Sequence, residues 1–300
     1  MKIFCTGASG YIGGSVAAHL VAGGHRVTGL VRSPDKADAI RGRGITPLIG
    51  TLDDAATLAQ AAREADAVVN AASADHKGAV DALLGALAGS GKPFIHTSGS
   101  SIVGTRSSGE RSDAVFDEDT PFTPSPARTA RVALNKQILA YRDNGCRPVI
   151  ICPSLIYGSG LGVEPHSTQV PLLIELAKKR GNAAHAGPGA NIWSNVHIDD
   201  LVTLYALAID KARPGAFYFV ENGENSMHEV CVAINRMLGF AREPSAMSMQ
   251  EAAAVWGEGT AEDTMASNSR VRAKRARAEL AWQAKARSLI AEIEQGCYRE

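Results

Sequence analysis

The chain has 300 residues, of which 45% are hydrophobic and 21% are charged, as expected for a globular protein of one large or two small domains. Lysine plus arginine and aspartate plus glutamate each number 31, so net charge favours neither nucleic acid nor an anionic membrane as a partner. No apolar run reaches the ~18–20 residues of a membrane span, and the start MKIFCTGASG lacks the apolar core of a signal peptide. The cysteines are scattered without a CxxC pair. We therefore expect a cytoplasmic protein with reduced thiols, no membrane or nucleic-acid partner and no metal site.

Short apolar segments in the first half of the chain are predicted to be strands. They are rich in β-branched or aromatic residues and apolar along nearly their whole length, as strands buried on both faces are. In chain order they are KIFCT, HRVTGLV, ITPLI, DAVVNAA, PFIHTS and RPVIICPS. The segments 11–22, 54–64, 77–88 and 128–143 between them are rich in alanine and leucine and predict helices. This alternation predicts an α/β fold with a doubly wound, parallel Rossmann sheet.

The second half has a looser pattern. Helices are predicted over residues 171–180, 199–210, 227–238 and 270–282, and strands over 192–197 and 216–220. The long polar loop 99–126 precedes this half. Loops of this length inside a compact domain are usually functional or mobile. We expect a sheet domain over residues 1–155 and a smaller C-terminal cap over 156–300, with residues 192–210 returning to the sheet.

A glycine-rich turn joins the first predicted strand to the first predicted helix. Its glycines are Gly7, Gly10 and Gly13, in the spacing GxxGxxG. The first permits a tight turn, the second lets a pyrophosphate approach the backbone, and the third lets the helix pack closely on the strand. Free N–H groups and the helix dipole favour phosphate at the helix N-terminus. The setting between strand and helix therefore favours a dinucleotide site over a simple turn.

The end of the second strand bears on the choice of dinucleotide. An NAD site places Asp or Glu there to bind the ribose 2′-hydroxyl. This chain has GLVRSPDK, so Arg32 stands near the position of the acid, and Ser33 follows it. A guanidinium suits a 2′-phosphate in charge and in geometry, so the sequence favours NADP over NAD. The alternative is that Arg32 is a solvated surface charge.

The opening TGASGYIGG resembles that of the extended and atypical short-chain dehydrogenase/reductase superfamily. Further matches follow in the family's order: Asp53 after the third strand, NAAS at the fourth, HTSGSSIVG at the fifth, PSLIYG, WSNVHIDDL and the C-terminal ELAW. The resemblance implies a Rossmann domain that binds NAD(P), a cap that binds a small-molecule substrate, and a cleft between them. The cofactor-binding residues that it implies, together with the glycine turn and Arg32, are Gly7, Ser9, Gly10, Tyr11, Ile12, Gly13, Arg32, Ser33, Asp53, Ala71, Ala72, Lys136, Pro153 and Leu155.

The chain departs from the family at the catalytic residues. The family handles the substrate's proton with a serine, a tyrosine and a lysine four residues after the tyrosine. No tyrosine of this chain has a lysine at that spacing, and the family's YxxSK aligns best with residues 132–136, so that Val132 replaces tyrosine and Lys136 remains. The serine segment is also irregular, with Gly99 near the usual place. The chain therefore resembles the atypical branch that has a TSG motif and lacks the tyrosine.

Three groups could supply the missing proton. Lys136 could do so if burial and the cofactor's charge lower its pKa, or it could bind only the ribose. Tyr157 could act from the nicotinamide side or merely pack in a loop, and Ser98 and Ser100 could act directly or hold a water. Arg128 and Arg131 are interpreted as a solvated helix end, with an anionic substrate as the alternative.

We expect an NADP-dependent oxidoreductase that transfers hydride between NADPH and a small carbonyl or alcohol. The alternatives are a non-catalytic NAD(P) sensor and, from the family resemblance, a sugar-nucleotide epimerase or dehydratase. The chain is expected to be a monomer or a homodimer. Its basic run near the C-terminus is interpreted as a solvated surface of a helix, with members Arg270, Arg272, Lys274, Arg275 and Arg277.

Overall fold

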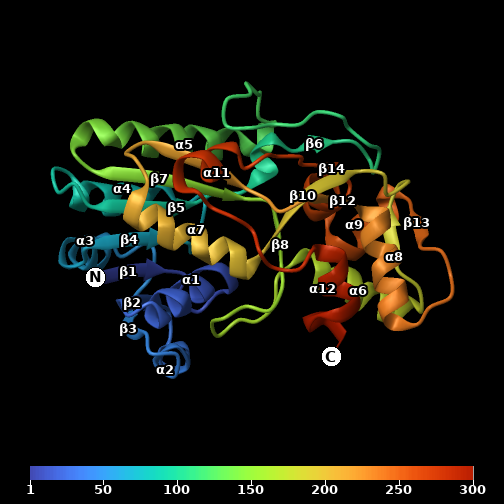
Figure 1. Ribbon diagram of the computed structural model, residues 1–300, viewed down its shortest axis with the longest axis horizontal. Coiled ribbons are helices and arrows are strands. Elements are labelled where there is room, and N and C mark those ends of the chain that lie inside the picture. The colour runs from blue at the N-terminus through green and yellow to red at the C-terminus, as the bar shows by residue number, and fades with distance from the viewer. Residues whose placement is uncertain (300) are drawn as a thin grey trace.

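Seven parallel strands form one sheet at the centre of the larger lobe (Figure 1). The computed structural model describes residues 1–299. The spatial order β11-β7-β5-β4-β1-β2-β3 confirms the predicted doubly wound parallel sheet. The first six of these strands along the chain correspond to the six segments predicted from the first half. The strands are β1 (Lys2–Thr6), β2 (Arg26–Val31), β3 (Thr46–Ile49), β4 (Ala67–Asn70), β5 (Pro93–Thr97), β7 (Arg147–Pro153) and β11 (Ala216–Val220).

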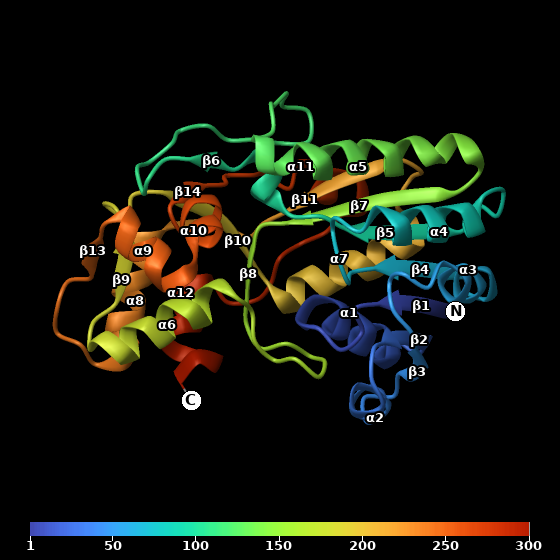
Figure 2. The same cartoon turned by 180° about the vertical axis from the view of Figure 1, so that it is seen from behind.

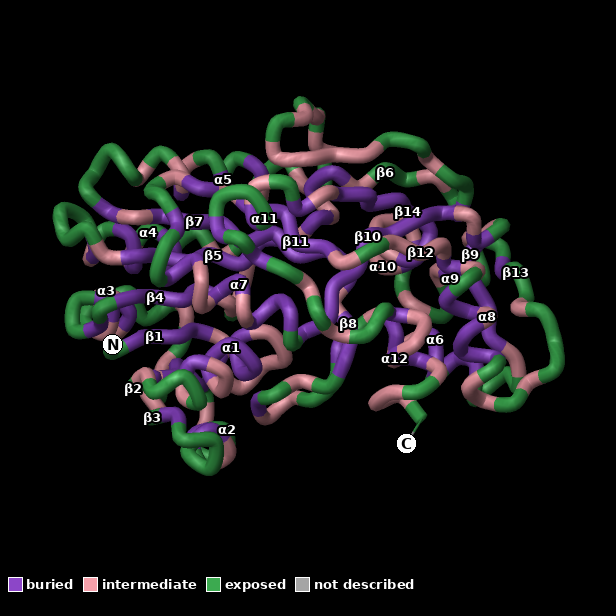
Figure 3. Tube along the Cα trace, in the orientation of Figure 1, coloured by how far each residue is buried: buried purple, intermediate pink, exposed green. Residues whose placement is uncertain are grey.

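Helices cover both faces of this sheet, as Figure 2 shows from behind. Because side chains alternate along a strand, Ile3 and Cys5 of β1 enter one hydrophobic core and Phe4 enters the other. The first core is closed by α1 (Tyr11–Ala22), α2 (Pro34–Arg41), α7 (Ile198–Lys211) and α11 (Lys274–Leu280). The second is closed by α3 (Ala55–Glu64), α4 (Lys77–Leu87) and α5 (Thr129–Ala140). Buried positions accordingly follow the strands (Figure 3).

The C-terminal half of the chain contributes to the larger lobe. Strand β11 pairs in parallel with β7, from Ala216 opposite Val149 to Val220 opposite Pro153. Trp282, which is 1% exposed, follows α11 and donates a hydrogen bond of 3.0 Å from its indole to the carbonyl of Asp200 on α7. The return to the sheet thus includes β11 and α11 in addition to the residues 192–210 expected from the sequence.

The smaller lobe lies at the carboxyl edge of the sheet, because β7 leads through Ser154 directly into its first strand. A three-stranded sheet and two-stranded ladders pack there against helices around a core that includes Tyr157 and Trp193. Its strands are β8 (Leu155–Tyr157), β10 (Ile192–His197), β12 (Glu224–Ser226), β9 (Ala184–Ala186) and β13 (Ser245–Met247). Its helices are α6 (Gln169–Arg180), α8 (Met227–Leu238), α9 (Met249–Trp256), α10 (Glu258–Thr260) and α12 (Leu289–Gln295).

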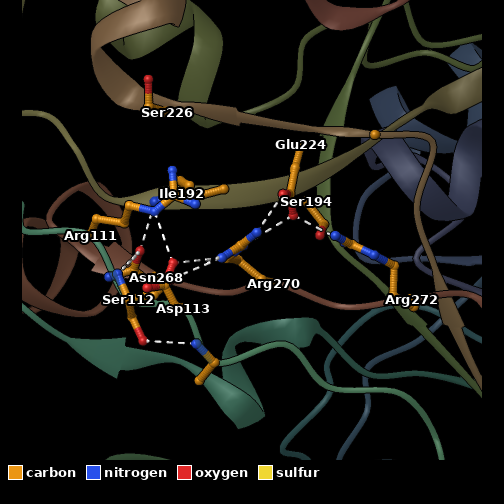
Figure 4. Close-up of polar contacts among 12 residues, drawn as sticks. Arg111, Ser112, Asp113, Ile192, Ser194, Glu224, Ser226, Asn268, Arg270 and Arg272 are labelled. Carbon is orange, nitrogen blue, oxygen red and sulfur yellow. Dashed lines mark hydrogen bonds and ion pairs between the residues drawn. The ribbon is translucent and has the colours of Figure 1, made fainter.

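The long loop after β5 is tied to a C-terminal segment of the chain. Strand β6 (Thr105–Arg106) pairs with β14 (Ser267–Asn268). The side-chain oxygen of Asn268 accepts hydrogen bonds from the backbone N–H groups of Ser112 (3.1 Å) and Ile192 (2.8 Å), so one residue joins the loop to the smaller lobe. Figure 4 shows this contact beside a second one, formed by Arg270.

The predicted solvated basic helix is wrong at its start, whereas Lys274 and Arg277 are exposed on α11 as expected. Residues 270–273 are not helical, and α11 begins only at Lys274. Arg270 is 8% exposed and forms a two-pronged ion pair with Glu224 at 2.7 and 3.1 Å (Figure 4). The other basic residues also have acidic partners: Arg272 with Glu224, Lys274 and Arg275 with Asp119, and Arg277 with Glu221. These charges therefore hold segments of the chain together.

Cys5, Cys146, Cys152 and Cys231 are buried, and burial raises the pKa of the Cys5 and Cys231 thiols to about 12. None of the helices within residues 1–299 is long and apolar enough to cross a membrane. The same residues contain no group of three or more His, Cys, Asp or Glu side chains that could hold a metal ion.

Candidate active site

The glycine turn after β1 is built from close backbone contacts. Gly7 has φ +72°, and a Cβ placed on it would lie 2.9 Å from the backbone of Ala71 and Ala72 beyond β4. A Cβ on Gly13 would lie 2.4 Å from the Gly7 carbonyl oxygen. Neither space can hold a side chain, so both positions require glycine for the turn to pack between β4 and α1.

Gly10 is different, because open space lies beside it. A Cβ placed there would meet within 4 Å only the Gly7 oxygen, at 3.4 Å. Gly10 is also the N-cap of α1, with no side-chain cap and no acidic residue in the first turn, while Ser9, Tyr11 and Ile12 are half-buried around it. An uncapped helix N-terminus beside open space suits a pyrophosphate, so these residues fit a dinucleotide.

The end of β4 is fixed against the glycine turn by Thr6. Its hydroxyl donates to the side-chain oxygen of Asn70 at 2.7 Å and accepts from the N–H groups of Ala71 and Ala72, each at 3.2 Å. The Asn70 amide in turn lies 3.0 Å from Nδ1 of His96 on β5. The three adjacent strands β1, β4 and β5 therefore present their carboxyl ends as one connected edge.

The residues expected near the adenosine lie at the same edge of the sheet. Arg32 directly follows β2, is exposed, and has no ion-pair or hydrogen-bond partner within residues 1–299. Ser33 caps α2 by accepting from the N–H of Lys36 at 3.4 Å. Asp53 is exposed and lies 3.1 Å from the imidazole of His76.

A polar cluster occupies the edge beyond β4 and β5, and consists of Asp75, Ser98, Ser101, Arg131 and Asn135. Asn135 donates to the Ser98 hydroxyl at 2.9 Å. Arg131 donates to Asp75 from Nε at 2.7 Å and from Nη2 at 2.5 Å, while its Nη1 lies 3.5 Å from the Ser101 hydroxyl. The ion pair raises the pKa of Arg131 and lowers that of Asp75, so both stay charged.

Lys136 does not belong to this cluster. It is exposed, and it lines a hollow of about 460 Å³ together with Val132, Pro121 and Phe122. Each step along a helix turns the side-chain direction by about 100°, so residues four apart share a face and their neighbours do not. The face of α5 that meets Ser98 therefore carries Arg131 and Asn135, one residue before the pair Val132 and Lys136 that the alignment favoured.

The structure also argues against two predicted proton donors. The Tyr157 hydroxyl donates to the carbonyl of Arg287 at 2.6 Å, its side chain is fully buried, and burial raises its pKa. Ser100 is 1% exposed, and its hydroxyl accepts from Ser269 at 2.8 Å. Both side chains therefore hold segments of the chain together, and of the predicted donors only Ser98 lies in the cluster.

The remaining predicted cofactor contacts lie where β7 passes into β8. Pro153 ends β7, and Leu155 begins β8 with its side chain 2% exposed in the core of the smaller lobe. The Leu155 side chain is thus committed to packing, which leaves its backbone as the part that could meet a nicotinamide.

Three residues of the edge were not predicted from the sequence: Asp75, Asn135 and His96. His96 is fully buried, and desolvation lowers its pKa to about 4, so it is neutral at physiological pH. Oδ1 of Asn135 is buried and has no hydrogen-bond partner within residues 1–299. Orphaned polar atoms of this kind favour a site for a ligand or water. The spacing of Arg131 and Asn135, four residues apart, was the one sequence signal that could have revealed this face.

Comparisons with known proteins agree with this geometry. Residues 3–219 match the NAD dependent epimerase/dehydratase family. Oxidase ucsJ from Acremonium sp is 33% identical over 98% of this chain and 95% of that protein, and 2-alkyl-3-oxoalkanoate reductase from Stenotrophomonas maltophilia is 26% identical over 84% and 80%. The dTDP-glucose 4,6-dehydratase of Bacillus anthracis, solved in complex with NAD, superposes with a TM-score of 0.79 at 18% identity, covering 98% of this chain and 94% of that one. The chain therefore belongs to the NAD dependent epimerase/dehydratase family and is an NAD(P)-dependent enzyme of the oxidoreductase type.

Proposed function

We propose that the protein is an NADP-dependent reductase that transfers hydride from NADPH to a small carbonyl compound, and that catalyses the reverse alcohol oxidation. The observation that carries this proposal is the connected edge of β1, β4 and β5, which places the glycine turn and the polar cluster side by side. The similarity to a 2-alkyl-3-oxoalkanoate reductase supports reduction of a keto group as the reaction class.

The roles of this chain's residues follow from their positions. The backbone around Gly10 would hold the pyrophosphate, and the segment after Asn70 would contact the cofactor, which would supply the hydride. Asn135 fixes the orientation of Ser98 at the nicotinamide end through its 2.9 Å hydrogen bond, and its unpartnered Oδ1 accepts from a ribose hydroxyl. The ribose contact expected for Lys136 is thereby transferred to Asn135.

The proposed preference for NADP rests on Arg32. Its guanidinium is exposed beside the glycine turn and unpaired within residues 1–299, so it can bind a 2′-phosphate without breaking an existing contact. Arg32→Ala is expected to raise the Kd for NADPH by about tenfold or more, the equivalent of one charge-assisted hydrogen bond, and to leave the Kd for NADH unchanged. Fluorescence titration of both cofactors measures this.

Arg43→Ala is the matched control for this titration, because Arg43 is exposed beyond the far end of α2. It should alter neither affinity. If Arg32→Ala raised the Kd for NADPH and the Kd for NADH equally, Arg32 would not recognise the 2′-phosphate.

Steady-state NADPH consumption against a panel of aldehydes and ketones tests the reaction itself, with UDP-glucose and dTDP-glucose in parallel. The proposal predicts turnover of at least one carbonyl compound and no conversion of the sugar nucleotides. Epimerisation or dehydration of a sugar nucleotide, or tight NADPH binding without any carbonyl turnover, would contradict it.

A further inference from the structure

Arg131 is held in a way that leaves one of its nitrogen atoms with only a distant partner among the described residues. The Asp75 carboxylate accepts hydrogen bonds from Nε and Nη2 of Arg131, at 2.7 and 2.5 Å, and so fixes the plane of the guanidinium. Nη1 carries two hydrogens and has a single partner within residues 1–299, the Ser101 hydroxyl at the long distance of 3.5 Å. A donor in a fixed plane therefore remains available to a ligand.

The neighbours of Nη1 place it at the nicotinamide end of the cofactor site. A Cβ added to Gly99 would lie 3.8 Å from Nη1, and Gly99 follows β5 in the segment where the family carries its active-site serine. Asp75 lies three residues beyond Ala72, whose backbone packs against Gly7. The Arg131 side chain is 17% exposed, so it lies in the wall of the site and is shielded from bulk water.

Arg131 and Asn135 also have the spacing of the missing catalytic pair. Residues four apart on a helix share a face, and this face of α5 meets Ser98 and Ser101. We propose, on the basis of the reductase function above, that Arg131 takes the tyrosine's place: its Nη1 group binds the substrate's carbonyl oxygen and stabilises the alkoxide that hydride transfer creates.

The chemical step balances without a protein acid. Hydride passes from C4 of NADPH to the carbonyl carbon, the π-electron pair of the C=O bond moves to oxygen, and the cofactor leaves as NADP⁺. The resulting alkoxide is stabilised by the N–H of Arg131 and then takes a proton from water. Arg131 acts electrostatically throughout and keeps its own proton, as donors of an oxyanion hole do.

The ion pair also indicates the substrate class. Asp75 neutralises Arg131 in the resting site, so the pair has no net charge with which to attract an anion in the ground state. Negative charge develops on the substrate oxygen only during hydride transfer. The fixed donor therefore stabilises the transition state more than it stabilises the bound substrate. The geometry therefore favours a neutral aldehyde or ketone over a keto acid.

Arg131→Ala and Arg131→Lys, each assayed with the best carbonyl substrate from the panel, test this proposal. Arg131→Ala is expected to lower kcat by on the order of 10²–10³-fold, the usual effect of one oxyanion donor, with the Kd for NADPH unchanged. Arg131→Lys should recover part of the loss, and added guanidinium should partly rescue Arg131→Ala. The kinetic isotope effect of [4-²H]NADPH should rise in Arg131→Ala, because hydride transfer becomes limiting.

The pH profile separates this mechanism from one that uses a protein acid. The Asp75 hydrogen bonds raise the pKa of Arg131, and those from Arg131 lower the pKa of Asp75, so neither group titrates near neutrality. Wild-type kcat/KM should therefore be flat between roughly pH 6 and 9. Asp75→Asn tests Asp75 as a positioning residue, since it frees the guanidinium and should make the enzyme sensitive to inhibition by acetate.

Arg142→Ala serves as the control, because Arg142 is an exposed arginine beyond the far end of α5. It should leave kcat and the isotope effect unchanged. An active wild-type enzyme whose Arg131→Ala variant keeps its kcat, or whose kcat/KM follows a single ionisation near pH 7, would overturn the role of Arg131 and leave the reductase function standing. A wild-type enzyme without carbonyl turnover would overturn both.

Discussion

The rotation of helix α5 about its axis decides which of its side chains reach the polar cluster. A shift of a single residue along the helix changes the face that does so. Leu134 and Ile138 pack into the core beneath α5 and thereby set the rotation of the helix. With that rotation fixed, Arg131 and Asn135 meet the ends of β4 and β5, and Lys136 turns outward. The polar face of a short helix thus depends on how its apolar residues pack, and a retained lysine does not by itself show where the catalytic face lies.

At the residue scale this arrangement predicts opposite outcomes for neighbouring substitutions. Asn135→Ala removes the hydrogen bond to Ser98 and the proposed ribose acceptor, so the Kd for NADPH should rise by about fivefold to tenfold, as expected for one hydrogen bond. Lys136→Ala removes only an exposed side chain and should change the Kd by less than twofold. Titration of both variants by NADPH fluorescence checks this.

A large loss of affinity in Lys136→Ala, with Asn135→Ala unaffected, would restore the original alignment of the lysine. The sequence could not show whether Asn135 or Lys136 faces the cofactor site. VALNK keeps the family's lysine, and the contacts that orient the helix come from segments distant in the chain. The glycine turn was easier to predict, since Gly7 and Gly13 are required by contacts within a strand-turn-helix unit that is local in sequence.

At the scale of elements, the ion pair of Arg270 with Glu224 links β12 to the segment that crosses the long loop after β5 (Figure 4). Arg270 also donates to the carbonyl of Ser112 at 3.1 Å, so the same guanidinium holds the loop. The hydrogen bond from Arg270, and then the one from Arg272, lower the pKa of Glu224 from 4.5 to about 2. This network therefore couples the stability of the fold to pH.

The sign of that coupling follows from the depressed pKa. A carboxyl whose folded pKa lies below its unfolded value stabilises the fold fully above about pH 4.5, and the stabilisation is lost as pH falls toward 2. Glu224→Gln should thus lower Tm by several degrees at pH 7, and the gap from wild type should narrow steadily as the pH falls from 4.5 to 2.5. Thermal denaturation followed by circular dichroism across this range measures the gap.

Glu64→Gln is the control for this measurement, because Glu64 is exposed at the end of α3. Its Tm should follow that of wild type at every pH. A gap for Glu224→Gln that stays constant down to pH 2.5 would mean that the carboxylate charge contributes nothing to stability.

The helices differ in how well the local sequence predicts where they begin and end. Helix α8 has the predicted bounds, because Ser226 and Glu229 form a capping box and Gly239 ends the helix in the left-handed conformation. The predicted helix over residues 270–282 failed at its start, because each of residues 270–273 has a partner elsewhere: Arg270 pairs with Glu224 and the N–H of Ala273 donates to Glu221. Tertiary contacts there override a sequence that favours helix by propensity.

At the scale of the whole molecule, both halves of the chain contribute strands to the seven-stranded sheet of the larger lobe. Strand β11 comes from the second half of the chain and pairs along its own full length with β7, and α7 and α11 cover the face beneath it. The six strands before it were predictable from buried apolar runs. The place of β11 was not, because its partner β7 lies more than 60 residues earlier in the chain.

The fragment 1–155 is therefore expected not to fold independently, since it would expose the edge of β7 and the apolar face that α7 covers. Circular dichroism and thermal denaturation of this fragment, beside the full chain, test the expectation. A cooperative unfolding transition of the isolated fragment would show instead that residues 1–155 form an autonomous domain.

The two lobes meet where the glycine turn, Arg32 and the polar cluster share one edge of the sheet, and the central claim is that NADPH bound there gives hydride to a carbonyl. Deuterium transfer tests it most directly. The protein is incubated with a reactive aldehyde and each stereoisomer of [4-²H]NADPH, and the alcohol is examined by mass spectrometry. One deuterium is expected in the product from one stereoisomer and none from the other; bound NADPH that delivers no deuterium from either would contradict hydride transfer at this site.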